Sequence, residues 1–299
     1  MISRILCLLF LCLSGVPVLG QDCLQRAEEI APALSKETRS EFEAKLANAR
    51  KDFETVPSAD NLIWLGRRTA YLGHYKDAIQ IFTQGIEEFP DDARFLRHRG
   101  HRLITLRCFD AAVDDLKRAA KLIKGKPDQV EPDGLPNARN IPTSTLQSNI
   151  WYHLGLAQYL KRDFKASLKS WREAEKVSKN ADMLVATTHW LYMTLRRLGR
   201  KKEAANAVAT LEPELEVIEN GDYLKLIRLY QGRTTAEELI KEIGGEANAL
   251  SQASIGYGLG NWFLYNNRRT DAESIFRRII LGNQWASFGH IAAEAELSR

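Results

Sequence analysis

The sequence lacks several features that would place the protein in a class at once. No segment beyond the first twenty residues is apolar for long enough to cross a bilayer, which takes about twenty residues in a helix. The net charge is +4 over 299 residues, too small to indicate nucleic acid as a partner. We therefore expect no stable membrane span and no nucleic-acid binding.

Cysteine is also scarce, with four residues in the chain. Cys7 and Cys12 lie in the N-terminal segment described below, which leaves Cys23 and Cys108. These two could form a disulfide in an oxidising compartment. Because Cys108 is expected at a hairpin turn and Cys23 near a loose terminus, the sequence leaves open whether they pair.

Catalytic motifs are missing as well. The chain has no nucleophile elbow, no phosphate-binding loop and no zinc-protease pattern. His98 and His101 have a helical spacing that can ligate a metal, but arginines flank both and no cysteine or carboxylate lies in the same turn. We expect no metal, no cofactor and no enzymatic activity.

The first twenty residues have the features of a signal peptide. Arg4 gives a positive start, residues 5–13 are nine consecutive apolar residues, and Gly20 is small enough to precede a cleavage site. Nine apolar residues are too few to span a bilayer. We expect export to a periplasm or to the exterior, with cleavage near Gln21.

A period of 34 residues governs the part of the chain that follows. The positions that repeat are Gly66 and Gly100, Ala78 and Ala112, Phe82 and Leu116, and Gly85 and Ala119. A further copy contains Trp151, Leu154, Gly155, Phe164, Ser167, Trp171 and Ala174. A two-helix unit of this kind cannot bury its own apolar face and stacks on copies of itself. We expect Trp151 and Trp171 to be buried where these units stack.

This pattern resembles the consensus of the tetratricopeptide repeat family, in seven positions of each of three copies. The chain is similar to exported bacterial members of that family, which share a fold and a binding habit rather than one substrate. The resemblance implies an all-α fold, a right-handed α-solenoid of stacked helix-turn-helix hairpins. We expect five to six hairpins and a terminal helix.

The expected organisation follows the period and its interruptions. The segments are a signal peptide at 1–20, an N-terminal helical cap or degenerate repeat at 21–58, two repeat units at 59–123, a proline-rich insertion loop at 124–147, two units at 148–212, an irregular helical hairpin at 213–252, and a unit with a C-terminal capping helix at 253–299. Within them we expect helices near residues 24–31 and 283–297, and a capping box between Thr235 and Glu238.

The insertion loop holds four of the nine prolines, which excludes a helix there. Ordered loops of this length are often functional, although a tolerated surface insertion is the alternative. We expect Leu135, Ile141 and Leu146 to attach the loop to the repeats. The residues that would offer a polar cluster are Asn137, Arg139 and Asn140.

In tetratricopeptide repeat proteins, ligand-facing side chains come from fixed positions that line a concave groove. The resemblance therefore implies these partner-binding residues: Arg67, Tyr71, Arg94, Arg97, His101, Asn149, Tyr152, Tyr159, His189, Arg197, Tyr257 and Asn261. Arginine binds carboxylates through two hydrogen bonds, and tyrosine adds contact area at a low entropic cost. An acidic or carboxylate-ended peptide is the expected ligand, unless these arginines only solvate the helices or pair with neighbouring acids. We expect these side chains to point away from the packing interfaces.

Two functions remain open. The first is an exported scaffold or adaptor that mediates protein–protein interaction through its groove. The alternative is an accessory subunit or a small-ligand receptor in which the insertion loop closes over the groove. The sequence does not identify the partner, the oligomeric state or the source organism.

Overall fold

The structure, a computed structural model, describes residues 19–212, 214–244 and 249–298. Within these ranges the chain forms fifteen helices and no β-strand, apart from one antiparallel bridge between Val130 and Thr145. No helix in the described ranges is both long and apolar enough to cross a membrane. Most of the expected signal peptide falls on residues 1–18, outside the described ranges.

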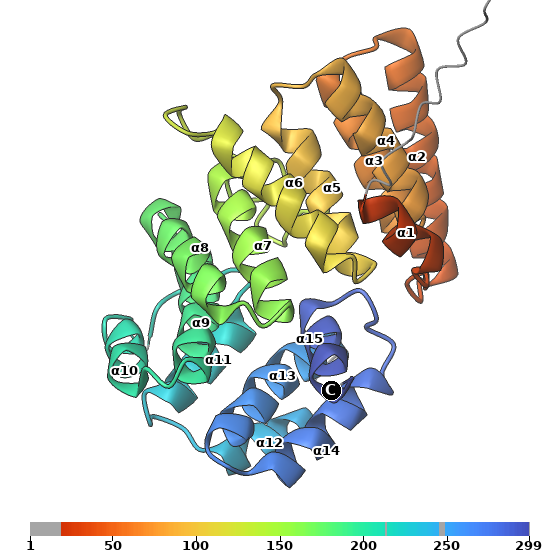
Figure 1. The fold of residues 1–299 in the computed structure, drawn as a ribbon. Coiled ribbons are helices and arrows are strands. Elements are labelled where there is room, and N and C mark those ends of the chain that lie inside the picture. Colours follow the sequence, from red (N-terminus) through yellow and green to blue (C-terminus); the bar gives the residue numbers. More distant parts are fainter. Residues whose placement is uncertain (1–18, 213, 245–248, 299) are drawn as a thin grey trace, which may run out of the picture.

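Consecutive helices pack as hairpins that stack along the molecule (Figure 1). Six pairs of consecutive helices are joined by short turns: α3 (Ala59–Tyr71) with α4 (Tyr75–Glu88), α5 (Ala93–Thr105) with α6 (Phe109–Leu122), α7 (Leu146–Leu160) with α8 (Phe164–Val177), α9 (Ala181–Arg197) with α10 (Lys201–Ala209), α11 (Gly221–Tyr230) with α12 (Ala236–Gly244), and α13 (Ala249–Tyr265) with α14 (Arg269–Ile280). The fifth pair differs from the others, because α11 packs on α9 and α13, and α12 packs on α13, rather than on each other. Helices α1 (Leu19–Arg26) and α2 (Lys36–Thr55) precede them, and α15 (Phe288–Leu297) follows. The all-α helical-repeat solenoid predicted from the period is confirmed.

In four hairpins a glycine of the first helix faces a large side chain sixteen residues later in the second. The pairs are Gly66 with Phe82, Gly100 with Leu116, Gly155 with Trp171, and Gly260 with Phe276. A Cβ atom at Gly155 would lie 2.8 Å from two ring atoms of Trp171. The small residue therefore lets the two helices approach closely, and the large one fills the space between them.

Each hairpin turn contains one residue with a positive φ. Glycine occupies this position in three turns, whereas Arg107, Arg162 and Asn267 occupy it in the others, with φ values of 62°, 65° and 63°. The left-handed conformation is uncommon for residues with a side chain. The turn geometry is therefore a property of the repeat, since it is kept where glycine is absent.

The irregular parts of the fold agree with the sequence in one place and differ in others. Thr235 and Glu238 form the expected reciprocal bonds at the start of α12, at 2.9 and 3.2 Å. The first helix ends at Arg26 rather than near residue 31, and α15 begins at Phe288 rather than at residue 283. Trp171 is fully buried as expected, but Trp151 is only partly buried.

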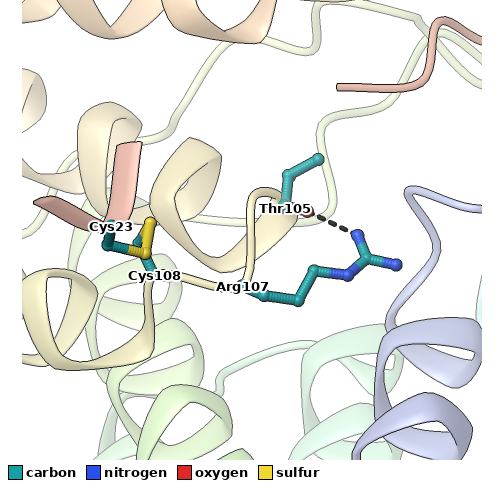
Figure 2. The surroundings of a disulfide bond; sticks show 4 residues. All are labelled: Cys23, Thr105, Arg107 and Cys108. Atoms are coloured by element: carbon teal, nitrogen blue, oxygen red, sulfur yellow. Dashed lines mark hydrogen bonds between the residues drawn. A yellow bond between two sulfur atoms is a disulfide. The ribbon is translucent and has the colours of Figure 1, made fainter. Parts of the chain in front are cut away.

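The turn between α5 and α6 connects both ends of the solenoid (Figure 2). Cys108 in this turn forms a disulfide with Cys23 of α1, so the two cysteines that the sequence left open do pair. Its neighbour Arg107 donates hydrogen bonds to Glu294 of α15 at 2.5 Å and to the Trp285 carbonyl at 3.1 Å. The first and last helices are therefore attached to one turn of the second hairpin.

Candidate binding site at the insertion loop

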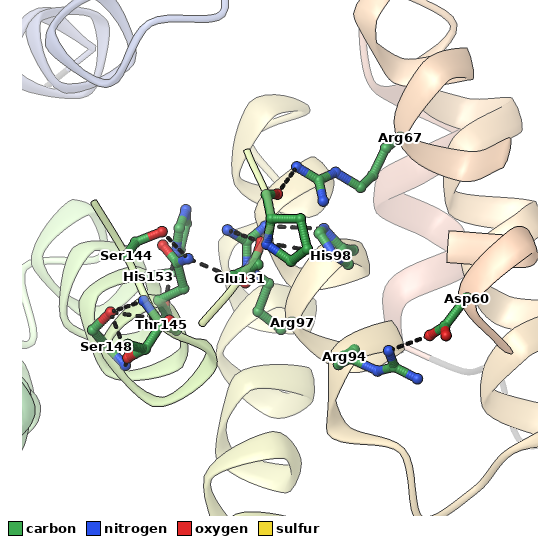
Figure 3. Close-up of polar contacts among 12 residues, drawn as sticks. Asp60, Arg67, Arg94, Arg97, His98, Glu131, Ser144, Thr145, Ser148 and His153 are labelled. Atoms are coloured by element: carbon green, nitrogen blue, oxygen red, sulfur yellow. Dashed lines mark hydrogen bonds and ion pairs between the residues drawn. The ribbon is translucent and has the colours of Figure 1, made fainter. Parts of the chain in front are cut away.

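The insertion loop ends in the structure where α7 begins, at Leu146, two residues before the expected boundary. It attaches to α3 and α5, where the sequence placed the basic end of the groove (Figure 3). Arg97 Nη2 lies 2.8 Å from Glu131 Oε1, and both side chains are 10% exposed. Arg97 Nη1 lies 3.0 Å from His98 Nδ1, whereas Arg97 Nε has no partner among the described residues. The loop thus supplies a buried carboxylate to an arginine that was expected to bind a partner's carboxylate.

Two further arginines bind the backbone of the loop. Arg67 Nη2 donates to the Pro132 carbonyl at 2.8 Å, and Arg68 Nη1 donates to the Gly134 carbonyl at 2.9 Å. The chain passes so close to Tyr71 that a Cβ atom at Gly134 would lie 1.6 Å from the tyrosine hydroxyl oxygen. Glycine is therefore required for the loop to reach these arginines.

The other side of the loop attaches to the middle of the solenoid. Asn149 Nδ2 donates to Glu131 Oε2 at 3.1 Å, so both carboxylate oxygens of Glu131 have partners. Thr143 donates its hydroxyl proton to Glu219, and its carbonyl accepts a hydrogen bond from Asn180 Nδ2 at 2.7 Å. The loop therefore spans from α3 to the segment before α11.

The predicted polar cluster in the loop shapes a turn. Asn137 Oδ1 accepts hydrogen bonds from the backbone N–H groups of Arg139 and Ile141, at 3.1 and 3.3 Å. Asn140 has a φ of 52°, which fits the tolerance of asparagine for this conformation. Asn140 and Arg139 are exposed, and Arg139 reaches an exposed Glu216 at 2.6 Å.

Apolar contacts contribute less to the attachment than the sequence suggested. Leu146 is buried, but Leu135 and Ile141 are 54% and 49% exposed, as is Val130 at 63%. The expectation that Leu135 and Ile141 attach the loop to the repeats is therefore wrong. Hydrogen bonds and ion pairs to Glu131, Pro132, Gly134 and Thr143 hold the loop instead.

Several neutral histidines lie beside the arginines. Burial, followed by the positive charge of Arg97 or Arg102, lowers the pKa of His98, His101 and His153 well below the ordinary value. The rings of His101 and His153 lie 4.4 Å apart between centroids. Among the described residues, no group of three or more histidine, cysteine or acidic side chains is placed to hold a metal ion.

The other expected groove residues form a buried interior. The Tyr159 hydroxyl accepts hydrogen bonds from the Tyr257 hydroxyl at 3.1 Å and from Asn261 Nδ2 at 2.6 Å. Arg197 pairs with Glu296 of α15 at 2.8 Å, and His189 stacks on Tyr223 with centroids 4.4 Å apart. The expected groove residues with less than 9% of their surface exposed are Arg97, Asn149, Tyr152, Tyr159, His189, Tyr257 and Asn261.

The expectation that these side chains point away from packing interfaces is therefore wrong. The insertion loop covers Arg67 and Arg97, whereas α15 and Tyr223 cover the residues farther along. Their role in binding a partner stays a prediction, because burial in this conformation does not test it.

Arg94 lies apart from the other expected site residues. It pairs with Asp60 at 2.5 Å and with Asp92 at 2.6 Å, and it lines an open cleft of about 770 Å³ together with Leu122 and Pro127. Tyr71 and His101 are partly buried beside the loop attachment. The basic end predicted from the sequence is thus divided between two separate depressions.

Sequence reasoning missed four residues that the site uses: Arg68, Arg102, Glu131 and Glu296. Arg68 and Arg102 each directly follow a position that was named from the repeat, so the register gave no reason to include them. Glu131 carried one signal, since it is an acid in a loop expected near a basic surface. No sequence signal identified Glu296, because its position depends on where the final helix packs.

No protein-family model matches the sequence, and no curated protein matches it. Solved structures do resemble this one. A tetratricopeptide repeat protein from Parabacteroides merdae aligns with a TM-score of 0.50 and 12% identity, over 93% of this chain and 99% of that chain. Pseudomonas aeruginosa pilF gives 0.47 and 16%, over 93% and 97%. The protein YrrB, described as having an unusual peptide-binding site, gives 0.43 and 13%, over 84% and 98%. At sequence identities of 12% to 16%, the similarity to these structures concerns the fold alone.

Proposed function

We propose that this protein is an exported scaffold that binds an acidic, extended segment of another protein where its own insertion loop now lies. The observation that carries this proposal is the loop itself. One carboxylate and two carbonyls of a non-helical segment are bound by Arg97, Arg67 and Arg68. These donors suit any segment that offers the same groups at the same spacing, including a carboxylate-ended one.

The way the loop is held supports an exchange of segments. Leu135, Ile141 and Val130 are already exposed, so releasing the loop removes little apolar contact. The contacts that are lost are polar, and an incoming acidic segment can replace them one for one. A partner bound in this way would be sensitive to salt, because its principal contact is an ion pair.

Export is supported by two separate features. The first twenty residues have the pattern of a cleaved signal peptide. The disulfide between Cys23 and Cys108 is of the kind that persists in an oxidising compartment. We propose a periplasmic or secreted location and a role in binding rather than catalysis.

The proposal is tested by supplying the loop segment from outside. In one variant a short glycine-serine linker replaces residues 128–142, which removes Glu131 together with Pro132 and Gly134, and a synthetic peptide of residues 128–136 is titrated into it. We expect saturable binding that weakens with salt, with the peptide substitution Glu131→Gln and with the protein substitution Arg97→Gln. The unaltered chain should bind the peptide more weakly, because its own loop competes.

Circular dichroism confirms that the linker variant is folded before binding is measured. A folded variant that does not bind the peptide would show that the surface does not accept segments in exchange. If binding occurs, the same variant is used to capture proteins from the envelope of the exporting cell. A partner that the linker variant recovers in stoichiometric amount, and that Arg97→Gln loses, then identifies the ligand.

A second candidate function is that of an accessory subunit or small-ligand receptor in which the loop closes over the groove. The observation that favours it is that the loop attaches to Arg67 and Arg97, which both line a small cavity. A purified chain that carries a bound small molecule in native mass spectrometry would support this function.

A further inference from the structure

A cavity of about 110 Å³ lies between α3 and α5, at the attachment of the insertion loop. Its lining residues are Arg67, Ala70, Tyr71, Phe82, Arg97, His98, His101 and Arg102. The volume is sufficient for several water molecules or for one small polyatomic ion. None of the residues that line it is acidic.

The positive charge at this cavity exceeds the negative charge that faces it. Arg97 pairs with Glu131 from the loop, but the hydrogen bonds of Arg67 go to the Pro132 carbonyl and the Tyr71 hydroxyl, which are both neutral. The Arg102 side chain has no hydrogen bond or ion pair among the described residues, and its guanidinium carbon lies 5.7 Å from the centre of the Tyr75 ring.

Other nearby groups do not correct this imbalance. Burial, together with the charges of Arg97 and Arg67, lowers the pKa of Arg102 to about 10, so it remains charged at neutral pH. His98 and His101 are neutral for the same reasons. Asp133, another acid of the loop, is only partly buried, and burial followed by the charge of Glu219 raises its pKa. Three guanidinium groups thus meet one close carboxylate.

The Nε atom of Arg97, a buried hydrogen-bond donor without a partner among the described residues, also indicates a ligand at this cavity. Arg97 is 8% exposed and lines the cavity, and its Nε has no hydrogen-bond partner among the described residues. A buried polar group without a partner is costly, and so is a buried charge without a counter-ion. An anion in the cavity would satisfy both requirements at once.

We propose that this cavity binds a small inorganic oxyanion of the phosphate type through Arg102, Arg97 and Arg67. Guanidinium groups suit this class because each presents parallel N–H donors to two oxygen atoms. The proposal deepens the second candidate function by naming its ligand class, and it does not depend on the binding of a protein partner. The ion would bind with the loop in place.

The test is phosphate binding by the full disulfide-bonded chain, measured by calorimetry and by the thermal midpoint at constant ionic strength. We expect saturable binding of phosphate and a midpoint that rises with its concentration. Arg102→Gln should weaken binding by about 10- to 100-fold, as expected for loss of a charged hydrogen bond. Arg118→Gln serves as the matched control, because Arg118 is exposed on α6 and does not line the cavity, and it should retain phosphate binding.

A measurement of stability without phosphate distinguishes a loss of binding from a loss of folding in Arg102→Gln. In phosphate-free buffer Arg102→Gln should be no less stable than the unaltered chain, because it removes a charge without a counter-ion. Arg102→Lys should bind phosphate with intermediate affinity, since lysine keeps the positive charge but lacks the parallel N–H donors of the guanidinium group. Absence of saturable phosphate binding, or unchanged binding by Arg102→Gln, overturns the proposal.

A further arm separates a free ion from a phosphate carried by a peptide. A phosphoserine peptide should bind more weakly than phosphate, since the small cavity has no room for a chain. Tighter binding of that peptide would show that the ligand is not the free ion. Peptide exchange at the loop would remain a separate question, because it is measured with an unphosphorylated segment.

Discussion

Arg97 and Glu131 form an ion pair that connects α5 to the insertion loop, with each side chain only 10% exposed. The exposed pair of Arg139 and Glu216 lies in the same part of the molecule, at 2.6 Å. The two pairs have similar lengths but different solvent access. Their energetic contributions should therefore differ strongly.

Glu131→Ala should destabilise the fold by about 3 to 5 kcal/mol, because it leaves Arg97 buried without its partner. Glu216→Ala, the matched control, should cost about 0 to 1 kcal/mol, as is usual for an exposed pair. Urea unfolding of both variants gives the comparison. Equal effects would mean that the loop does not bury Arg97 in solution.

Reduction of the disulfide should lower stability. Cys23 and Cys108 are separated by 85 residues, so the bond restricts a long loop in the unfolded chain. We expect Cys23→Ser combined with Cys108→Ser to cost about 2 to 4 kcal/mol in chemical denaturation. Addition of reductant should destabilise the unaltered chain similarly and leave the double variant unchanged. A chain insensitive to reductant would contradict this pairing.

Gly155→Ala should destabilise the third hairpin, because the new methyl group would lie 2.8 Å from the Trp171 ring. Overpacking of this kind costs about 1 to 3 kcal/mol. Gly221→Ala provides the control, since a Cβ atom there meets nothing within 4 Å and its φ is not positive. That change should be neutral or stabilise by about 0.4 to 1 kcal/mol. The two thermal midpoints should therefore move in opposite directions or differ clearly in size.

The two tryptophans of the third hairpin should behave differently. Trp171 is fully buried, and Trp171→Ala should cost about 3 to 5 kcal/mol. Trp151 is partly buried, so Trp151→Ala should cost clearly less. Equal losses in equilibrium unfolding would show that Trp151 is as buried as the repeat pattern first indicated.

Acid should destabilise the fold through its buried histidines. Burial lowers the pKa of His189 to about 3, whereas in the unfolded chain it is about 6.5. Between these values the unfolded chain binds a proton at this site and the folded chain does not. Stability is therefore complete above pH 6.5 and decreases as the pH falls, by about 1.4 kcal/mol per unit for His189.

His189→Gln should reduce this dependence on pH. Denaturation curves at pH 7.5 and 5.0 measure the difference in unfolding free energy for both chains. His98, His101 and His153 contribute in the same direction, so some dependence should remain in the variant. An unchanged difference would show that His189 is accessible to protons in the folded chain.

The 34-residue period predicted that the hairpins stack, but it did not predict which residues cover the concave side of the stack. Gly66, Gly100 and Gly155 recur with their large partners sixteen residues on, and that local relationship determines each hairpin. The closure of the concave side depends on residues far apart in sequence, such as Arg197 with Glu296 and His189 with Tyr223. No periodicity connects such pairs, so the sequence predicted an open groove where the structure has an interior.

For the insertion loop, the sequence likewise predicted the position of the segment but not the contacts that hold it. Proline content excluded a helix at residues 124–147, and the structure has no helix between Leu122 at the end of α6 and Leu146 at the start of α7. The apolar character of Leu135 and Ile141 suggested burial, yet it is Glu131 and the carbonyl groups of Pro132 and Gly134 that make the contacts. Backbone carbonyls are present at every residue and therefore leave no trace in composition.

The attachment of both ends to the turn at Arg107 and Cys108 affects how the molecule would respond to force. Repeat arrays in general can unzip from a free end, because each unit contacts only its neighbours. Here tension applied at the termini passes through Cys23 to Cys108 and through Glu294 to Arg107, and so reaches the second hairpin directly. The hairpins between this turn and α15 are enclosed in a loop that the tension bypasses until Arg107 releases Glu294. In a pulling experiment the hairpins of this closed loop should therefore extend only after the contact between Arg107 and Glu294 breaks, and not one after another from a free end.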